Sequence, residues 1–221
     1  MNKKKTLILL LLLTVCFCAP FLLNNDKKLQ MQKVEVLNEK IIGTQPIIKV
    51  KELKSRYDIT IDKMNQKMEE IKSIEDKKEW FIAYKSIVEE YSYIIDPPET
   101  IYDYFSKEEL DLLFYVVQAE VGDEYSFESK VNVANVIFNR FYHERFPDTL
   151  SDILVCDQFS SIADGRYREV EVSEDTILAC EYAFILEDTT DGCLFFDSNN
   201  TLNYQFVFND STHNFYKYRE E

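Results

Sequence analysis

The sequence has few histidines and little positive charge, and both shortages exclude classes of function. Only His143 and His213 are present, far apart and without the HExxH spacing of a zinc protease, so we predict no metal site and no cofactor. Lysine and arginine number 25 against 40 acidic residues, which gives a formal net charge of −15 at pH 7. Such a chain has little with which to neutralise phosphates, so we expect no nucleic-acid partner.

What is present is enough apolar material for a core. Hydrophobic residues make up 46% and aromatic residues 14% of the 221 positions. A chain of this length can hold one well-packed domain plus an appendage.

The first 23 residues have the pattern of an export signal or a single membrane anchor. Residues 1–5 are basic, and residues 6–23 are apolar apart from Thr6 and Thr14. The stretch is close to the roughly 18 residues that cross a bilayer, and it lacks a good small-x-small cleavage site, so we expect an uncleaved anchor. Positive charge before it keeps that end cytoplasmic, so the rest of the chain is predicted to be extracytoplasmic. Cys16 fits a lipoprotein motif poorly because Val15 precedes it.

Three cysteines follow the anchor, namely Cys156, Cys180 and Cys193. An odd number outside the cell allows one disulfide with a free thiol, or no disulfide. A Cys–His amidase or peptidase would need Cys156 or Cys193 beside His213, with the cysteine at a helix N-terminus that stabilises thiolate. Cys156 instead follows a predicted helix and Cys193 begins a predicted strand, so this enzyme class is the weaker alternative.

The segment before the globular domain is predicted to be a spacer. Residues 24–49 are polar and read as a linker, and residues 51–93 have apolar positions at helical spacing, which predicts two helices. The first helix could serve as a stalk or short coiled coil, and the second has a broad apolar face that we expect to pack on the downstream domain. After Pro97 and Pro98 we expect an extended connection over residues 100–105. The predicted domains are therefore residues 1–23, 24–98 and 99–221.

The globular domain is predicted to begin with a helix that ends at a carboxylate. Ser106 and Glu109 form a capping-box pattern directly before an apolar run at helical spacing, and Gly122 breaks that run. Glu120 then lies in the last turn, where the negative pole of the helix raises the cost of ionising it and favours the protonated acid. The alternative is a solvated glutamate at a helix end.

The next predicted helix, residues 130–141, is apolar nearly all round and so belongs in the centre of the domain. Its polar residues need partners if they are buried, and they are Asn132, Asn135, Asn139 and Arg140. Arg140 is suited to fix a carboxylate such as Glu120 or Glu124, although an arginine at a helix end can also pair with surface acids.

A turn at residues 146–149 leads into a short helix that ends near Cys156, and an irregular stretch follows. Residues 158–167 combine hydroxyls, an amide, an acid, a turn glycine and an arginine, which indicates a sugar-binding loop. The alternative, an ordinary Asp-Gly turn, explains Asp164 and Gly165 but not the density of hydrogen-bonding groups around Phe159.

The last part of the chain combines one helix with a small sheet. Residues 172–186 form another predicted core helix, and three strand-like runs follow, separated by Asn, Asp and Ser turns. The predicted fold class is therefore α+β, mainly helical with a small antiparallel sheet.

Five motifs in this order resemble the cell wall hydrolases of the spore-cortex-lytic type. They are Ala119-Glu120 with Glu124, residues 133–140, residues 146–150, Gln158-Phe159-Ser160-Ser161 with Asp164-Gly165-Arg166, and His213-Asn214-Phe215-Tyr216. The resemblance spans residues 106–217 and implies a lysozyme-like domain that cuts the bond between N-acetylmuramic acid and N-acetylglucosamine in peptidoglycan. It also implies that Glu120 is the catalytic glutamate. The family often has Ala-Arg-Gly where this chain has Val121-Gly122-Asp123, and one residue is inserted before Lys130; these departures support an alternative, an inactive membrane-tethered wall-binding protein.

The chemistry of the residues agrees with a single catalytic acid. A glycoside hydrolase needs a second carboxylate, for which Glu124, Asp157 and Asp164 are the candidates. A lytic transglycosylase needs only one, because the muramic C6 hydroxyl attacks its own anomeric carbon while one glutamate acts first as acid and then as base. We therefore predict a lytic transglycosylase that binds peptidoglycan glycan strands. The predicted substrate-binding residues are Gln158, Phe159, Ser160, Ser161, Asp164, Arg166, Tyr204 and His213, with Glu124, Asn139, Arg140 and Asn214 in support.

Overall fold

The structure is a computed structural model that describes residues 44–155 and 159–219, with side chains described from residue 57 onward. The predicted anchor and most of the predicted linker lie outside these residues, as do Cys156, Asp157 and Gln158. The chain divides into two compact units, Met1–Pro98 and Glu99–Glu221. Within the described ranges, no helix is both long enough and apolar enough to span a bilayer.

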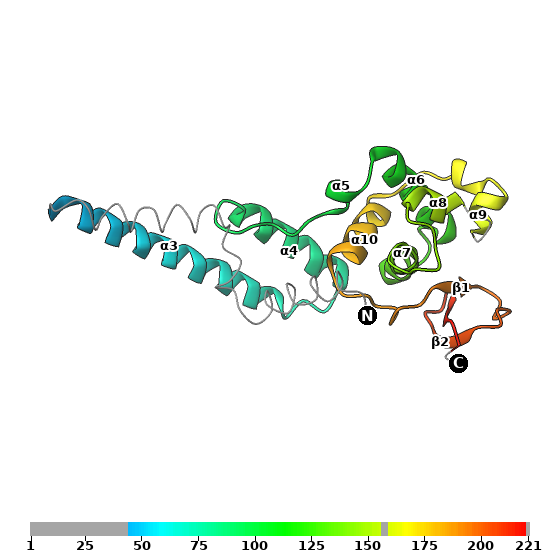
Figure 1. Ribbon diagram of the computed structural model, residues 1–221. Helices are drawn as coiled ribbons and strands as arrows, with labels where there is room; N and C mark the ends of the chain where they lie inside the picture. The colour runs from blue at the N-terminus through cyan, green and yellow to red at the C-terminus, as the bar shows by residue number, and fades with distance from the viewer. Residues whose placement is uncertain (1–43, 156–158, 220–221) are drawn as a thin grey trace. The chain divides into compact units, whose positions relative to one another are not determined.

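The first unit contains the two predicted helices, α3 (Thr44–Ile71) and α4 (Lys77–Tyr91) (Figure 1). Asp76 caps α4 by accepting a hydrogen bond from the Glu79 amide, and the buried side chains of α4 recur at helical spacing on one face: Phe81, Tyr84, Ile87 and Tyr91. The prediction of a linker up to residue 49 was wrong at its end, because α3 already begins at Thr44. Pro46 is compatible with this start, since amides in the first helical turn have no intrahelical partner to lose.

The second unit opens with a short helix where an extended connection was predicted. This helix, α5 (Ile101–Tyr104), is capped by Thr100, whose backbone amide and hydroxyl both donate to Asp103 Oδ2. Ile101 is fully buried. The local cap together with this one buried side chain stabilises a helical turn after the proline pair.

Helix α6 (Lys107–Glu120) has the predicted capping box, in which Ser106 accepts a bond from the Glu109 amide and Glu109 accepts one from the Ser106 amide. It ends at Glu120 because Val121 takes an extended conformation, with φ −132° and ψ 96°. The sequence prediction of both ends is confirmed, and the helix delivers Glu120 at its final position.

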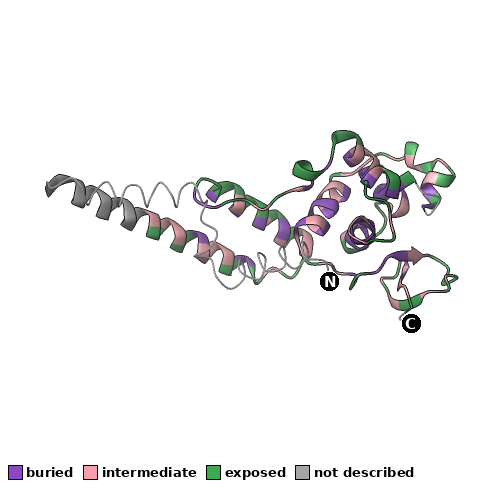
Figure 2. Cartoon of the chain, viewed as in Figure 1, coloured by how far each residue is buried: buried purple, intermediate pink, exposed green. Residues whose placement is uncertain are grey.

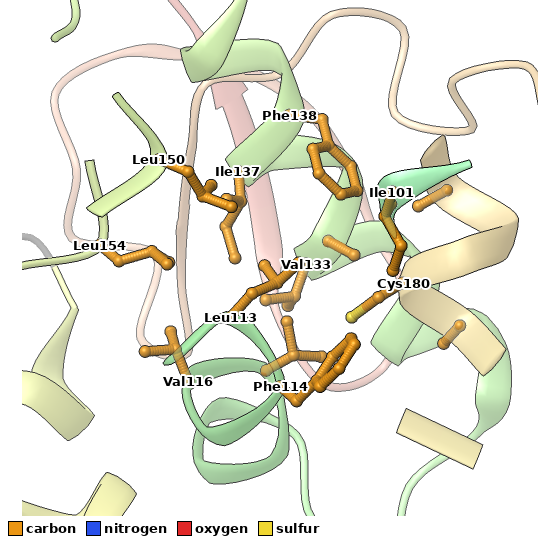
Figure 3. Packing of buried hydrophobic residues seen from close by; sticks show 14 of the residues in the cluster. Ile101, Leu113, Phe114, Val116, Val133, Ile137, Phe138, Leu150, Leu154 and Cys180 are labelled. Carbon is orange, nitrogen blue, oxygen red and sulfur yellow. The ribbon is translucent and has the colours of Figure 1, made fainter. Parts of the chain in front are cut away.

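Helix α7 (Phe127–Phe141) is the centre of the unit. It begins at the Ser126 cap, slightly before the predicted start, and every residue from Ser129 to Arg140 is buried. Figure 2 shows this helix as a largely buried element, and Figure 3 shows its Val133 beside Leu113 of α6 and its Phe138 near Ile101 of α5, all in one cluster with Ile137. Helices α5, α8 (Leu150–Val155), α9 (Ser160–Ala163) and α10 (Glu174–Ile185) also contribute to this core. The 3-10 turn η2 (Arg166–Arg168) has no buried residue.

The three predicted strands form one antiparallel sheet in the order β1 (Phe195–Asp197), β3 (Asn214–Lys217) and β2 (Gln205–Asn209). Phe215 of β3 packs with Val136 of α7 and with Cys193. A different cluster contains Phe195 and Tyr216. The mainly helical α+β fold is therefore confirmed. The small sheet contributes side chains to two separate hydrophobic clusters.

Candidate functional site

The Glu120 carboxylate is held by the start of α9, forty residues further along the chain. The Ser161 amide donates to Glu120 Oε1 at 3.0 Å, and the Ser160 hydroxyl lies 3.4 Å from Oε2. Glu120 is partly exposed, so its carboxylate is fixed in direction and still open to a ligand. The structure thus brings Ser160 and Ser161 of the 158–167 stretch next to Glu120.

Arg166 ties the same loop to α6. Its Nη1 donates to the Ala119 carbonyl at 3.1 Å, its Nη2 to the Ser160 hydroxyl at 2.9 Å, and its Nε to Asp164 Oδ2 at 2.7 Å. The Arg166 side chain therefore holds Ser160 in reach of Glu120. The same arginine lowers the pKa of Asp164 by hydrogen bonding to it.

Two predicted substrate-binding residues of this loop lie beneath it. Phe159 is 1% exposed, with its ring 4.8 Å from the Arg140 guanidinium, so it offers no free face to a sugar. The Ser161 side chain is fully buried, and what it contributes to the site is its backbone amide. Direct contact of these two side chains with substrate, as predicted, is therefore not supported.

His213 lies within electrostatic range of Glu120 although 93 residues separate them. It is 4% exposed, it packs edge-on against Phe196 at 4.9 Å, and its Nδ1 has no hydrogen-bond partner among the described residues. Burial lowers the pKa of His213, and the nearby carboxylates of Asp210, Glu120 and Asp197 oppose this only in part. His213 is therefore neutral at pH 7.

Asp197 is a residue near the site that sequence reasoning missed. Its carboxylate accepts bonds from the Tyr216 hydroxyl at 2.7 Å, the Asn200 amide at 2.9 Å and the Thr201 amide at 2.6 Å. Burial acts to raise the pKa of Asp197, but these donors outweigh burial and lower it. The sequence could have indicated Asp197 as a candidate, because it ends a predicted strand and precedes a polar turn.

A buried polar network holds the other side of Glu120. Lys130 is 2% exposed and donates from Nζ to Asp123 Oδ1 at 2.6 Å and to the Ser173 hydroxyl at 3.1 Å. Gln118 donates to Asp123 at 3.1 Å and accepts from the Ser173 amide at 3.0 Å and from the Thr176 hydroxyl at 2.5 Å. The bond from Lys130 is the main cause that lowers the pKa of Asp123 to about 2. The stretch 118–123, which includes Glu120, is thereby fixed to the start of α10.

The polar residues of α7 do find partners, as burial requires. Asn139 donates to Asp188, Thr190 and the Cys193 carbonyl. Arg140 donates from Nε to the Leu194 carbonyl at 2.7 Å. The expected bond from Arg140 to Glu120 or Glu124 is not among these contacts, and the described hydrogen bonds of Glu120 come from Ser160 and Ser161. Asn139 and Arg140 thus fasten α7 to the chain before β1.

The described contacts of three further predicted residues do not include the Glu120 carboxylate. Tyr204 stacks on Phe195 with ring centroids 4.0 Å apart and lines a pocket. Asn214 donates to the Asp197 carbonyl at 3.3 Å and therefore supports the sheet. Glu124 is exposed, and its carboxylate lies over Gly122, where an added Cβ would collide with Oε2.

Cysteine and metal chemistry receive no support in the described residues. Cys180 and Cys193 are buried free thiols, and burial raises the pKa of Cys193 to about 12, so neither presents a thiolate. No group of three or more His, Cys, Asp or Glu side chains suited to a metal occurs in residues 57–155 and 159–219.

Comparison with known proteins gives one family match. The model of the Cell Wall Hydrolase family matches residues 124–220, which confirms the resemblance inferred from the motifs. The match begins just after Glu120. A comparison with curated proteins found no match.

Two solved structures are similar to this chain. One is the catalytic domain of the germination-specific lytic transglycosylase SleB from Bacillus anthracis, with 22% identity and a TM-score of 0.47, covering 53% of this chain and all of that one. The other is the catalytic domain of the Bacillus cereus SleB protein, with 24% identity and a TM-score of 0.46, covering 51% of this chain and 92% of that one.

Proposed function

We propose that this cell-wall-hydrolase-like protein cleaves the glycan strands of peptidoglycan between N-acetylmuramic acid and N-acetylglucosamine, as a lytic transglycosylase with Glu120 as its single proton donor. The family match supports action on the cell wall. The observation that supports the chemistry is the partly exposed Glu120 carboxylate, which is oriented by two donors from the Ser160–Ser161 turn.

The reaction needs one group that gives and then regains a proton. Protonated Glu120 donates to the glycosidic oxygen, the bond to the muramic anomeric carbon breaks, and the C6 hydroxyl attacks that carbon. Glu120 then accepts the C6 hydroxyl proton, so the acid is restored and a 1,6-anhydro product leaves. While Glu120 is a carboxylate, the Ser161 amide at 3.0 Å and the Ser160 hydroxyl hold it in place for the second transfer.

Of the three candidate second acids, Asp157 lies outside the described residues, and the two that the structure describes favour this mechanism over hydrolysis. Asp164 is bonded to the Arg166 side chain at 2.7 Å and to the Arg166 amide at 3.0 Å, which occupies both carboxylate oxygens. Glu124 lies over Gly122 on the exposed surface. Neither arrangement leaves a carboxylate dedicated to activating a water molecule, whereas a hydrolase requires one at a defined separation from the acid.

We assign His213 to the wall of the site. His213 is neutral and 4% exposed, and the Nδ1 atom that lacks a described partner is itself buried, so this atom does not reach a sugar. Its packing against Phe196 fixes the ring. Its proposed role is to shape the wall against which the sugar lies, and Glu120 transfers the proton.

The protein is proposed to act outside the cytoplasm, where peptidoglycan lies. The apolar run at residues 6–23 would hold the chain at the membrane, and the following helical segment would space the globular unit from it. The net charge of −15 provides no long-range attraction to anionic wall polymers, so substrate is held by local contacts.

The experiment is digestion of purified peptidoglycan by the full chain, with released muropeptides identified by mass spectrometry. We expect 1,6-anhydromuramic ends, and Glu120→Gln is expected to lose about 10²-fold or more of the rate, the size of a general acid contribution. Glu124→Gln is expected to keep most of it. Reducing ends, combined with loss of activity in Glu124→Gln, would replace the transglycosylase by a two-carboxylate hydrolase. Binding to peptidoglycan without any release of muropeptides by the unmodified chain would identify a non-catalytic wall binder.

A further inference from the structure

A second pocket in the Glu99–Glu221 unit has a chemistry that the Glu120 site does not use. Its volume is about 470 Å³. We call it the tyrosine pocket, and it is lined by Glu144 together with His143, Arg145, Asn203, Tyr204, Tyr218 and Arg219. None of the residues that hydrogen-bond to Glu120 lines it.

The aromatic walls of the tyrosine pocket are fixed by one another. Tyr204 is stacked on Phe195 with an interplanar angle of 7°, and Tyr218 stands edge-on to Tyr204 at 5.8 Å and 87°. Tyr218 is also edge-on to Phe195 at 5.1 Å. Partly exposed, rigid tyrosines combine a flat apolar face with a polar hydroxyl, the combination that suits a sugar ring.

The pocket also contains two guanidinium groups without a carboxylate partner. Arg145 lies over the Tyr218 ring at 4.7 Å, and Arg219 donates to the Asn203 side-chain oxygen at 2.7 Å. Among the residues that the structure describes, neither forms an ion pair, not even with Glu144, which lines the same pocket. By contrast, Arg166 at the Glu120 site is paired with Asp164.

Within the residues that the structure describes, two arginines that line one pocket without a carboxylate partner are unexpected in so acidic a chain. With a formal net charge of −15, acidic side chains far outnumber the cations that could pair with them. The guanidinium group presents a planar fork of donors that matches a carboxylate, and charge-assisted bonds of this kind are among the stronger ones in proteins. The arrangement is therefore suited to an anion supplied by a ligand.

We infer that the tyrosine pocket is a second glycan-binding site, which holds a carboxylate-bearing sugar of the same strand that Glu120 cuts. This inference rests on the proposed function. A sugar ring would lie against Tyr204 or Tyr218, and its carboxylate would accept bonds from Arg145 and Arg219. The carboxylate could come from the lactyl group of an unsubstituted muramic acid or from a stem peptide attached to it.

The buried Arg140 side chain packs on one aromatic ring next to the tyrosine pocket and on another next to the Glu120 site. The Arg140 guanidinium lies 5.6 Å from the Phe195 ring, which supports Tyr204, and 4.8 Å from the Phe159 ring, which directly precedes Ser160. A strand of several sugars could contact both sites. The second site would then raise affinity for long strands and leave the proton transfer at Glu120 unchanged.

The test measures ligand binding by calorimetry with the full chain carrying Glu120→Gln, so that no ligand is cut. The probes are the disaccharide of N-acetylglucosamine and N-acetylmuramic acid with its free lactyl carboxylate, the same disaccharide bearing a stem peptide, and chitobiose, which has no carboxylate. In this background, Arg145→Gln and Arg219→Gln are each expected to weaken binding of the carboxylate probe about tenfold. Chitobiose binding is expected to be weaker from the start and unchanged by either substitution.

Arg168→Gln is the matched control. Arg168 also lies over a tyrosine ring at 4.7 Å, that of Tyr167, but it is outside the tyrosine pocket, so its loss changes the charge equally and should leave carboxylate binding unchanged. The two carboxylate probes separate the sources: a preference for the free disaccharide identifies the lactyl group, and a preference for the peptide-bearing one identifies the stem peptide.

The inference is overturned if chitobiose binds as tightly as both carboxylate probes, or if Arg145→Gln and Arg219→Gln bind like Arg168→Gln. Thermal unfolding midpoints of the variants, compared with that of the Glu120→Gln parent, show whether each remains folded. Failure of the second site would leave Glu120-dependent cleavage intact. Failure of the proposed function would instead appear as absence of cleavage by the unmodified chain, whatever the tyrosine pocket binds.

Discussion

Two lysine–carboxylate pairs of nearly equal length occur in the two units of the chain. In Lys130–Asp123 the atoms Nζ and Oδ1 are 2.6 Å apart, and in Lys67–Glu90 the atoms Nζ and Oε2 are 2.5 Å apart. The Lys67 and Glu90 side chains are 43% and 49% exposed, whereas the Lys130 side chain is 2% exposed. The pair between the helices is solvated on both sides, while the pair beside Glu120 includes a cation that cannot reach water.

This difference in burial determines how much each ion pair matters for stability. Removing one partner of a solvated pair returns the other to water, which costs little. Removing Asp123 leaves Lys130 buried with only the Ser173 hydroxyl among its described partners, and the segment next to Glu120 loses its attachment. The buried network therefore helps to hold Glu120 in position, whereas the exposed pairs contribute little to the structure.

The largest effect is expected for Asp123→Ala, because it leaves a buried cation without its carboxylate. We expect a loss of about 3 kcal/mol in the free energy of unfolding, measured with urea. The matched Glu90→Ala is expected to cost much less, because both partners of that pair are solvated. Adding Lys130→Met to Asp123→Ala should restore part of the loss, since the buried charge is then gone. Equal costs for the two alanine variants would show that burial does not distinguish the pairs.

The next largest effect is expected for Gln118→Ala. Its Oε1 accepts from the Ser173 amide, the Ser173 hydroxyl and the Thr176 hydroxyl, and Gln118 is 5% exposed. Loss of this acceptor leaves buried donors unsatisfied, at a cost of about 2 kcal/mol. The control is Gln66→Ala on α3, where the amide bonds the exposed Glu70 at 2.9 Å, and its effect should stay within about 0.5 kcal/mol. A similar cost for both glutamines would contradict the comparison.

A smaller effect is expected in the pH dependence of stability. The pKa of His213 is lowered by burial, so the unfolded chain binds a proton that the folded chain resists, and stability falls as pH drops below the ordinary histidine value of about 6.5. His213→Gln should flatten the dependence of stability on pH in this range.

A second change in stability is expected at lower pH. The pKa of Asp123 is lowered to about 2, so the stability that this carboxylate contributes is present above its ordinary pKa of 3.8 and is lost as pH falls from there towards 2. Asp123→Ala should remove the loss of stability between pH 3.8 and 2 and leave the His213-dependent loss below pH 6.5 unchanged.

Local signals predicted the skeleton of the site. The Ser106–Glu109 capping box and Gly122 gave both ends of α6, and so placed Glu120 at its last residue. The strand-like runs between Asn, Asp and Ser turns predicted the three strands, and the hydrogen-bonding residues of the 158–167 stretch marked the loop that contacts Glu120. These features depend on neighbours in the chain, which the sequence displays directly.

Features that depend on distant partners were predicted poorly. Arg140 was expected to bind Glu120 or Glu124, and nothing in the sequence indicated that its Nε donates to the carbonyl of Leu194, 54 residues away. The stacking of Tyr204 on Phe195 and its place in the lining of the tyrosine pocket were likewise not predicted. Lys130 gave no signal of pairing with Asp123 and Ser173, because a buried lysine and an exposed one have the same sequence pattern. The partners of these three side chains depend on tertiary packing, which no local sequence pattern specifies.

The most direct test of the central claim is the rate at which Glu120→Gln solubilises purified peptidoglycan, measured beside the unmodified chain and with unfolding midpoints recorded for both. The account predicts an unchanged midpoint, retained binding to the insoluble wall, and a rate reduced by about 10²-fold or more. A folded Glu120→Gln variant that releases muropeptides at the unmodified rate would contradict the assignment of Glu120 as the proton donor.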